Sequence, residues 1–263
     1  MEGEIALTGG GVTEGVVRVG NTVRRPTGPW TPTIHAYLRY LQERGFSGAP
    51  RVLGFDEEGR EVLAFVEGVV ASSSSWRRGH ANPVPVEALT DEALAGVGQL
   101  IRSLHDAAAG FRPTDPIWRE YAYPLLPGEI VCHGDLGPYN TVYQDGRPVA
   151  FIDWDGARPN DPLLEAGFAA WTYVPLDDDA YCLEMGFEQP PDRGRRLRIF
   201  GEAYGTGGPE FLEAVREAKQ REAEKSRYWP SMTPAIVADF LSHIVRELRW
   251  LAENENELRA ALA

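Results

Sequence analysis

Three oxygen-bearing side chains in one short stretch of the chain could support metal-dependent chemistry. The stretch VCHGDLGPYNTVYQDGRPVAFIDWD, residues 131–155, contains Asp135, Asn140 and Asp153. The pair Asp-Gly at 145–146 separates two short apolar runs, which is typical of a tight turn between two antiparallel strands. The sequence therefore predicts a β-hairpin with polar side chains at its open end.

The register of this hairpin decides which side chains meet. Folding the chain about the turn sets Asn140 opposite Phe151 and Asp153 opposite Pro138, so the amide and the carboxylate share the open end. Such oxygen atoms are the hard ligands that Mg²⁺ takes when phosphates supply its remaining positions. Asp135, one short loop away, is then free to orient a hydroxyl group. The alternative is a turn-rich hairpin whose acids are simply solvated.

The two motifs in this stretch also resemble a known family. HGDLGPYN followed by FIDWD is similar to the aminoglycoside phosphotransferase and choline kinase branch of the protein-kinase-like superfamily. The resemblance implies that Asp135 is the catalytic base, that Asn140 and Asp153 are the Mg²⁺ ligands, and that His133 is a structural residue of the loop. It implies ATP or GTP as the phosphoryl donor.

A nearby acidic loop departs from the family pattern. Asp161 falls where the family carries a loop that supports the site, but Asn160 replaces its glycine and Glu165 replaces its usual second acid. Asp161 is therefore expected to be structural.

The elements that must position these residues follow the family order. Short β-rich pieces in 5–25 precede a helix at about 32–44, and two further strands lie in 51–56 and 61–68. The order β, β, β, helix, β, β results. It is an antiparallel sheet with one helix.

A change in composition after Gly68 marks a boundary between two lobes. The segment that follows is rich in Ser and Pro and has little periodicity, whereas a convincing helix begins near Thr90. We expect an N-lobe at 1–68 and a mainly helical C-lobe at 69–263. Together they form an α+β, two-lobed protein-kinase-like fold.

The resemblance also places a nucleotide site in the N-lobe. Gly9, Gly10 and Gly11 would let backbone N–H groups approach the phosphates, although a flexible turn explains them equally well. Family members use a Lys on the third strand to hold phosphates and a small apolar residue two positions earlier to contact adenine. Val23 and Arg25 occupy these positions and share one strand face. Arginine keeps the charge but changes the geometry.

The helix and the hinge complete the predicted nucleotide site. His35 stands where the family carries the Glu that pairs with the Lys, so Arg25 and His35 are expected to face each other as two cationic groups, unless His35 is neutral or turned aside. A Glu at position 35 is then expected to be tolerated or even helpful. The backbone of Phe65 and Val66 is expected to receive adenine.

Whole-chain composition narrows the partners and the compartment. The 263 residues carry a formal charge of −13 and are 43% apolar, which favours a globular protein with a neutral or cationic ligand over one that binds nucleic acid or an anionic membrane. No segment reads as a leader peptide or a membrane span. Cys132 and Cys182 lie far apart and are expected to be reduced. A cytoplasmic protein is predicted.

The acceptor site is expected in the helical lobe, where acids and aromatic residues are concentrated. The candidate acids are Asp177, Asp178, Asp179, Glu184, Glu253, Glu255 and Glu257, and the candidate aromatic residues are Trp171, Tyr173, Tyr228, Trp229 and Trp250.

Taken together, the sequence predicts an ATP- and Mg²⁺-dependent phosphotransferase that acts on a hydroxyl group of a small molecule, with an aminoglycoside-like or other amine-bearing compound as the leading acceptor. The alternative is a kinase-like protein that binds a ligand without phosphotransfer, because Arg25 and His35 replace the Lys and the Glu. A metal-dependent hydrolase is disfavoured because no histidine cluster with ligand spacing accompanies the acids.

Overall fold

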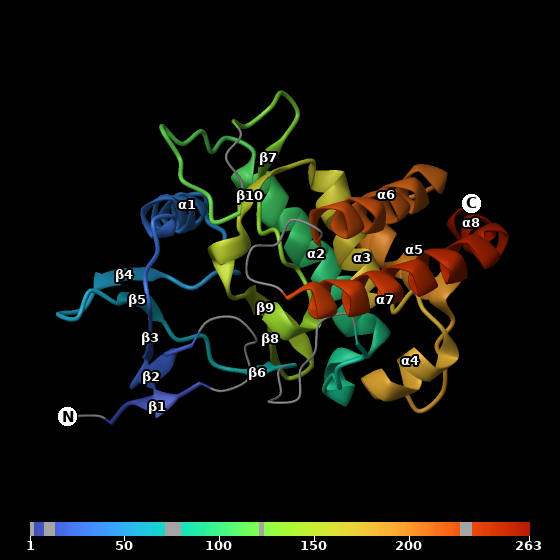
Figure 1. The fold of residues 1–263 in the computed structure, drawn as a ribbon, viewed down its shortest axis with the longest axis horizontal. Helices are drawn as coiled ribbons and strands as arrows, with labels where there is room; N and C mark the ends of the chain where they lie inside the picture. Colours follow the sequence, from blue (N-terminus) through green and yellow to red (C-terminus); the bar gives the residue numbers. More distant parts are fainter. Residues whose placement is uncertain (1–2, 8–13, 72–79, 121–123, 227–232) are drawn as a thin grey trace.

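The computed structural model describes residues 3–7, 14–71, 80–120, 124–226 and 233–263. Within these ranges the chain forms an α+β fold in which a small sheet with one helix lies beside a larger helical part (Figure 1). The elements of the first part are β1 (Ile5–Ala6), β2 (Val17–Val19), β3 (Thr22–Arg25), α1 (Thr31–Glu43), β4 (Val52–Phe55) and β5 (Glu61–Ala64). The predicted class and the predicted order of elements are confirmed.

The N-terminal sheet has the strand order β1-β2-β3-β5-β4, and all neighbouring strands are antiparallel. Gly20 has φ +54°, so a glycine suits the tight turn between β2 and β3. β3 pairs with β5 across the intervening helix α1 and strand β4, and this pairing sets Arg25 directly opposite Glu61. The sheet therefore brings together two charged residues that are far apart in the sequence.

Short strands form the middle of the molecule, between the N-terminal sheet and most of the helices (Figure 1). A three-stranded sheet has the order β6-β8-β9, and a two-stranded sheet pairs β7 with β10. The strands are β6 (Val69–Val70), β7 (Ile130–Cys132), β8 (Thr141–Gln144), β9 (Arg147–Phe151) and β10 (Arg158–Asn160), and the 3₁₀ turns are η1 (Val86–Ala88), η2 (Pro138–Asn140) and η3 (Trp154–Gly156). β6 begins at the predicted lobe boundary and pairs with β8.

Helices make up the rest of the C-terminal part. They are α2 (Asp91–Ala108), α3 (Pro162–Tyr173), α4 (Asp179–Met185), α5 (Arg193–Tyr204), α6 (Pro209–Ser226), α7 (Pro234–Glu253) and α8 (Glu255–Leu262). α2 begins as predicted, because the side chain of Thr90 accepts the N–H of Ala93. α2 packs against α5 and α3 packs against α6. Among the described residues, none of the helices combines the length and the apolar character needed to cross a membrane.

One hydrophobic core connects the two parts. It joins Leu38 and Leu41 of α1 to Leu104 of α2 and Phe151 of β9, and all four are buried. Cys132 belongs to the same core, and both it and Cys182 are free, as predicted. Because the core is shared, the sheet and the hairpin are held in a fixed relation.

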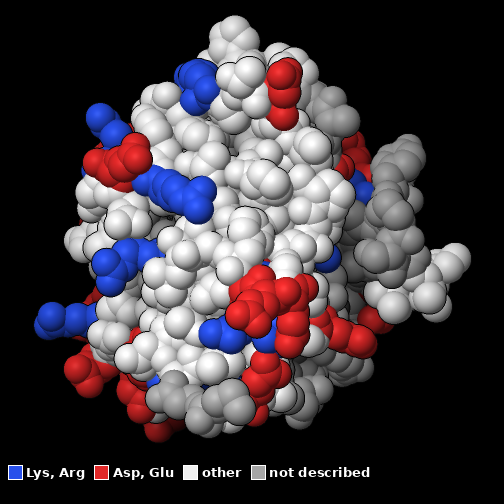
Figure 2. Space-filling model, turned by 90° about the vertical axis from the view of Figure 1, so that its left-hand side faces the viewer, with Lys and Arg blue, Asp and Glu red and all other residues white. Residues whose placement is uncertain are grey.

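The surface at the sheet end of the molecule carries both acidic and basic side chains (Figure 2). Figure 2 shows that uncharged side chains cover much of this face and that acidic and basic side chains stand next to one another in mixed groups. Ion pairs from Arg60 to Asp56 and Glu4 belong to the sheet part of the chain.

Candidate active site

Asp135 lies on the loop between β7 and η2, and its carboxylate is held on both sides. Tyr139 donates its hydroxyl to Asp135 Oδ1 at 3.0 Å, and the side-chain amide of Asn140 donates to Asp135 Oδ2 at 3.0 Å and to the Asp135 carbonyl at 2.9 Å. The loop between Asp135 and Asn140 is therefore closed by its own side chains. The structure brings these two predicted site residues together.

His133 holds the turn that precedes Asp135. Its ring is fully buried, its Nε2 donates to the carbonyl of Ile152 at 3.0 Å, and its Nδ1 accepts the backbone N–H of Asp135 at 3.3 Å. Burial lowers the pKa of His133. A neutral ring with its proton on Nε2 fits the structural role that the resemblance implies for His133.

Glu165 on α3 also holds the turn that precedes Asp135. Its carboxylate accepts the backbone N–H groups of His133 at 3.2 Å and Gly134 at 2.6 Å, and the ring of His105 at 2.9 Å. Burial raises the pKa of Glu165, but the hydrogen bond and the charge of His105 and the N–H of Gly134 outweigh it and lower the pKa to about 2. Asp161 caps α3 by accepting the N–H of Leu163, so its structural role is confirmed.

The hairpin forms, but its predicted register is wrong by one residue. Gln144 pairs with Arg147 and Tyr143 with Pro148, whereas Val142 pairs with Ala150, so the ladder skips one residue on β9. This β-bulge sets Thr141 opposite Phe151, and the Asn140 carbonyl accepts the N–H of Ile152 at 2.9 Å. A bulge adds one residue to one strand only, which alternation of apolar residues does not reveal.

Asp153 follows Ile152 at the end of the hairpin, in the left-handed region with φ +60°. The carbonyl of Asn140 accepts the backbone N–H of Ile152. The ring of His133 binds the carbonyl of Ile152 and the backbone N–H of Asp135. Asp135, Asn140 and Asp153 thus lie on segments that are bonded directly to one another. The side chain of Asp153 is 42% exposed, while that of Arg25, its ion-pair partner at 3.1 Å, is 8% exposed.

Arg25 points from β3 towards the hairpin, and it meets two carboxylates there and a third, Glu61, on β5. Its guanidinium lies 3.1 Å from Asp153, 2.6 Å from Asp155 and 3.1 Å from Glu61. Burial by itself lowers the pKa of Arg25, but the charges of the three carboxylates outweigh burial, so the pKa is raised above its usual value. Asp155 also contacts Arg119. Burial raises the pKa of Asp155 and outweighs the charges of Arg25 and Arg119, which lower it. Arg25 is therefore a fixed cation between sheet and hairpin.

Glu61 corrects the expectation about His35. The two carboxylate oxygens of Glu61 bind the guanidinium of Arg25 at 3.1 Å and the ring of His35 at 2.8 Å, so an anion separates the two groups that were expected to repel each other. A carboxylate at position 35 would face Glu61 and not Arg25, so the reason given for expecting a Glu to be tolerated there does not hold. The contact between Glu61 and Arg25 has no local signal in the sequence, because the two residues lie on strands β5 and β3, which are not consecutive along the chain.

Other predicted nucleotide residues lie along the same sheet. Arg24 is on the opposite face of β3 from Arg25 and approaches Asp56 at 3.9 Å, while Val23 is partly buried on the face of Arg25. The N–H of Phe65 donates to the carbonyl of Asn21, so an incoming ring can use the Phe65 carbonyl or the backbone of Val66. Gly9, Gly10 and Gly11 lie outside the described residues.

The donor set at the hairpin end fits a hard divalent cation such as Mg²⁺. Asn140 donates its amide nitrogen to Asp135, so its amide oxygen points away from Asp135. Asp153 uses Oδ1 to bind Arg25, and its Oδ2 remains for another partner. One amide oxygen and one carboxylate oxygen leave most of an octahedron for phosphate and water.

A cavity of about 80 Å³ lies next to the catalytic loop, on the side of the helical part. Tyr139 lines it and also binds Asp135, so the phenol connects the cavity to the predicted base. The cavity takes its other walls mainly from aromatic and apolar side chains, and its acids are Glu222 and Glu247. Glu247 is buried and accepts the indole N–H of Trp171 at 2.6 Å.

Of the residues predicted to bind the acceptor, only some lie at this cavity. Trp171 lines it, whereas Tyr173 is buried elsewhere with its hydroxyl on Thr141, and Asp177 is buried against Arg246. Tyr228 and Trp229 lie outside the described residues. Glu222 and Glu247 were not singled out from the sequence, since each stands alone on an amphipathic helix without a local motif.

Comparison with known proteins gives the family. The chain is 33% identical over 276 aligned residues to the trifolitoxin immunity protein of Rhizobium leguminosarum bv. trifolii, and the alignment covers 100% of both chains. The model of the phosphotransferase enzyme family matches residues 116–213, which include the catalytic loop and the hairpin. The chain belongs to the phosphotransferase enzyme family.

Solved structures with low sequence identity to this chain share its fold. A choline/ethanolamine kinase family protein from Mesorhizobium loti superposes with a TM-score of 0.59 at 19% identity and covers 96% of this chain and 90% of its own. Aminoglycoside 2′-phosphotransferase-IIIa, in complex with GDP, superposes with a TM-score of 0.55 at 12% identity and covers 94% and 93%. The predicted kinase-like fold is confirmed.

Proposed function

We propose that this phosphotransferase-family protein transfers the γ-phosphoryl group of a nucleoside triphosphate, taken as ATP, to a hydroxyl group of a small molecule. One observation carries the proposal. Asp135, Asn140 and Asp153 lie on directly bonded segments, with the cation Arg25 beside Asp153. This arrangement supplies the parts that phosphoryl transfer requires, namely a base, cation ligands and a positive charge near the phosphates.

Asp135 is the proposed base. It would orient the acceptor hydroxyl and take its proton while the oxygen attacks the γ-phosphorus and the bond to the β-phosphate oxygen breaks. The hydroxyl of Tyr139 now occupies Asp135 Oδ1, so the acceptor would share this oxygen with Tyr139 or displace it. Asn140 fixes the other carboxylate oxygen and keeps the carboxylate in one orientation.

The nucleotide would lie between the N-terminal sheet and the hairpin. Val23 would contact the adenine ring, and the backbone of Phe65 and Val66 would bind the edge of that ring. The segment Gly9–Gly11 would approach the phosphates. Mg²⁺, held by Asn140 and Asp153, would offset the charge on the transferring group. Arg25 would share its guanidinium between the phosphates and its carboxylates.

The acceptor would enter the cavity beside Tyr139. Aromatic walls with two acids suit an amine-bearing compound, in which an ammonium group meets Glu222 or Glu247 and the rings cover its apolar part. The full-length relative is named for immunity to a toxin. That name supports a toxic compound as the acceptor, with phosphorylation as the means of protection.

Binding without transfer is the rival function, and one observation favours it. Arg25 is already bound by three carboxylates and is almost completely buried, so its charge is less available to phosphates than that of an exposed lysine. A protein of this kind would sequester its ligand without modifying it.

Replacement of Asp135 tests the proposal against this rival. Release of ADP is followed over amino sugars, choline-like amines and simple alcohols, while nucleotide and Mg²⁺ binding are measured by calorimetry. Asp135→Asn should lower turnover by orders of magnitude and leave nucleotide affinity within about threefold, because Asp135 acts on the acceptor. The matched control is Asp106→Asn, an exposed aspartate on α2. Near-normal turnover of Asp135→Asn would exclude Asp135 as the base, and nucleotide binding without acceptor-dependent ADP release would favour the rival.

A further inference from the structure

A second group of possible metal ligands lies away from the catalytic loop. His80, Asp239 and His243 each present one ligand atom, and the three atoms lie within 4.8 Å of one another. We propose that these three residues form a binding site for a divalent transition-metal ion such as Zn²⁺, separate from the Mg²⁺ of the nucleotide.

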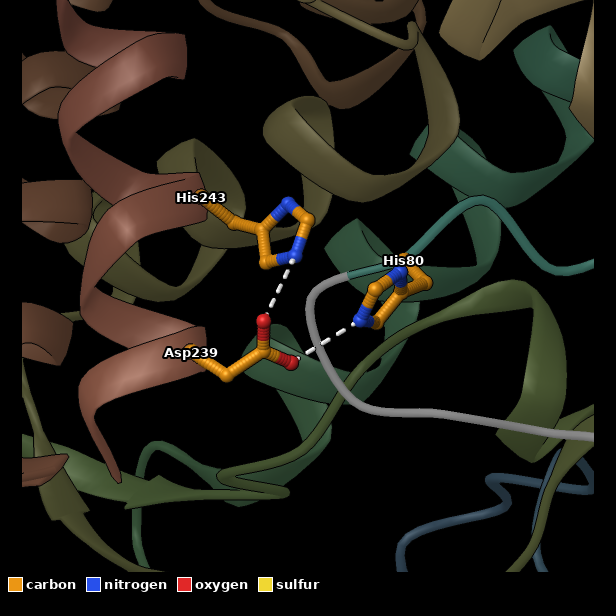
Figure 3. A group of neighbouring side chains, drawn as sticks. All are labelled: His80, Asp239 and His243. Atoms are coloured by element: carbon orange, nitrogen blue, oxygen red, sulfur yellow. Dashed lines mark hydrogen bonds and ion pairs between the residues drawn. The ribbon is translucent and has the colours of Figure 1, made fainter. Parts of the chain in front are cut away.

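The geometry places a carboxylate between two imidazoles (Figure 3). Asp239 and His243 are one turn apart on α7, and His80 approaches from the chain segment that precedes α2. Oδ2 of Asp239 lies 3.0 Å from His80 Nε2, and Oδ1 lies 3.6 Å from His243 Nε2. Ligand atoms at about 2.1 Å from a tetrahedral Zn²⁺ stand about 3.4 Å apart, so small side-chain movements complete the site.

The ligand types select the metal. Two imidazole nitrogens and one carboxylate oxygen suit Zn²⁺ better than Mg²⁺, which prefers oxygen ligands alone. With three protein ligands, a tetrahedral ion keeps one position for water or an outside ligand.

A hydrogen bond from Arg246 to His243 must break when the metal ion binds. Nη1 of Arg246 donates to His243 Nδ1 at 3.0 Å, which puts the ring proton on Nε2, the atom that faces Asp239. Metal binding at Nε2 moves this proton to Nδ1, so the ring and the guanidinium must separate while Arg246 stays bound to Asp177. We therefore expect a moderate affinity.

The site has a consequence for the acceptor cavity. His80 lines that cavity, and so does Phe240, which follows Asp239 on α7. A metal ion would connect the segment at His80 to α7 and hold this part of the cavity wall in place. The sequence carries no local sign of this cluster, because His80 and Asp239 are separated by 159 positions.

Among the described residues, the other group of possible metal ligands, His105, Cys132 and Glu165, is excluded as the metal site. All three are buried, and Glu165 already accepts the backbone N–H groups of the catalytic turn. Its chemistry also differs in a way that can be measured, because a thiolate ligand gives Co²⁺ a strong charge-transfer band and an N/O ligand set does not.

Metal binding is tested on the untagged full chain, without nucleotide, by calorimetry with Zn²⁺ and by visible absorption with Co²⁺. The wild type should bind one Zn²⁺ per chain and give weak Co²⁺ bands without thiolate charge transfer. His80→Gln, His243→Gln and Asp239→Asn should each weaken Zn²⁺ binding by at least about 10-fold, because even the loss of residues that only support ligands costs this much.

Asp106→Asn is the matched control for Asp239→Asn, since the two side chains are 59% and 56% exposed. It should bind Zn²⁺ as the wild type does. Asp239 is exposed, so Asp239→Asn keeps the test informative if a histidine variant fails to fold. No stoichiometric Zn²⁺ binding by the wild type, unchanged affinity in Asp239→Asn, or a thiolate band with Co²⁺ would each overturn the proposal.

Discussion

At the scale of single residues, Arg25 has two roles, one in the proposed nucleotide site and one in the stability of the fold. It is the cation at the proposed phosphate site, and it is also the buried counter-charge of Glu61, Asp153 and Asp155. Glu61 lies directly opposite Arg25 on the neighbouring strand β5. The ion pair between Arg25 and Glu61 is thus built within the sheet.

Replacing Arg25 should therefore affect stability as well as nucleotide binding. Arg25→Ala should lower the free energy of unfolding by about 3–5 kcal/mol, because it leaves buried carboxylates without their cation, and it should weaken nucleotide binding strongly. Arg24→Ala should cost less than about 1 kcal/mol, since Arg24 only approaches Asp56, at 3.9 Å. Urea unfolding and nucleotide calorimetry measure both effects. A larger loss for Arg24→Ala would refute the assigned strand face.

Glu165 should make the stability of the protein depend on acid. Its pKa of about 2 in the folded protein is lower than that of an unfolded glutamate, so its contribution is present above pH about 4.5 and is lost as the pH falls towards 2. Between pH 6 and pH 3 this amounts to roughly 2 kcal/mol. Glu165→Gln should be less stable at pH 6 and should lose less on acidification. Equal slopes of unfolding free energy against pH would contradict this assignment.

At the scale of elements, the catalytic turn depends on a close approach between two segments. Gly134 has φ +84°, and a Cβ atom there would lie 2.1 Å from the carbonyl oxygen of Gly156 in η3. The turn is also fixed by Glu165 and His133, so it has little room to adjust. Only glycine meets both the backbone and the space requirement at this position.

A pair of glycine variants separates the two requirements. Gly128 has a similar φ of +88° but nothing within 4 Å of its Cβ position. Gly128→Ala should cost about 1–2 kcal/mol, the ordinary penalty for a left-handed residue, and Gly134→Ala should cost at least about 2 kcal/mol more and abolish turnover. Thermal unfolding and ADP release measure the two effects. Equal stability of the two variants would mean that η3 moves away without cost.

At the scale of the whole molecule, the net charge of −13 should favour the approach of cationic acceptors. A compound with an ammonium group should associate several-fold more slowly when NaCl is raised from low to physiological concentration, because the Debye length shrinks to about 8 Å. An analogue with a hydroxyl in place of the amine should show almost no change. Stopped-flow association rates compare the two compounds. Equal salt dependence would argue against electrostatic guidance of the acceptor.

The sequence by itself determined the elements whose signals are local. The hairpin, α2 and the association of Asp135 with Asn140 could be predicted from local signals. These signals are the Asp-Gly turn, the cap at Thr90 and the motifs HGDLGPYN and FIDWD, and each of them spans only a few residues. The same holds for the strand face of Arg25, which follows from alternation along β3.

Tertiary structure decided the features that depend on contacts between distant segments. The bulge in β9 shifted the hairpin register by one residue. The pairing of β3 with β5 placed Glu61 between Arg25 and His35. The packing of α3 under the turn gave Glu165 its role. These outcomes follow from hydrogen bonds and ion pairs between residues far apart in the chain, and the energy of such contacts is set by the fold and leaves no local pattern in the sequence.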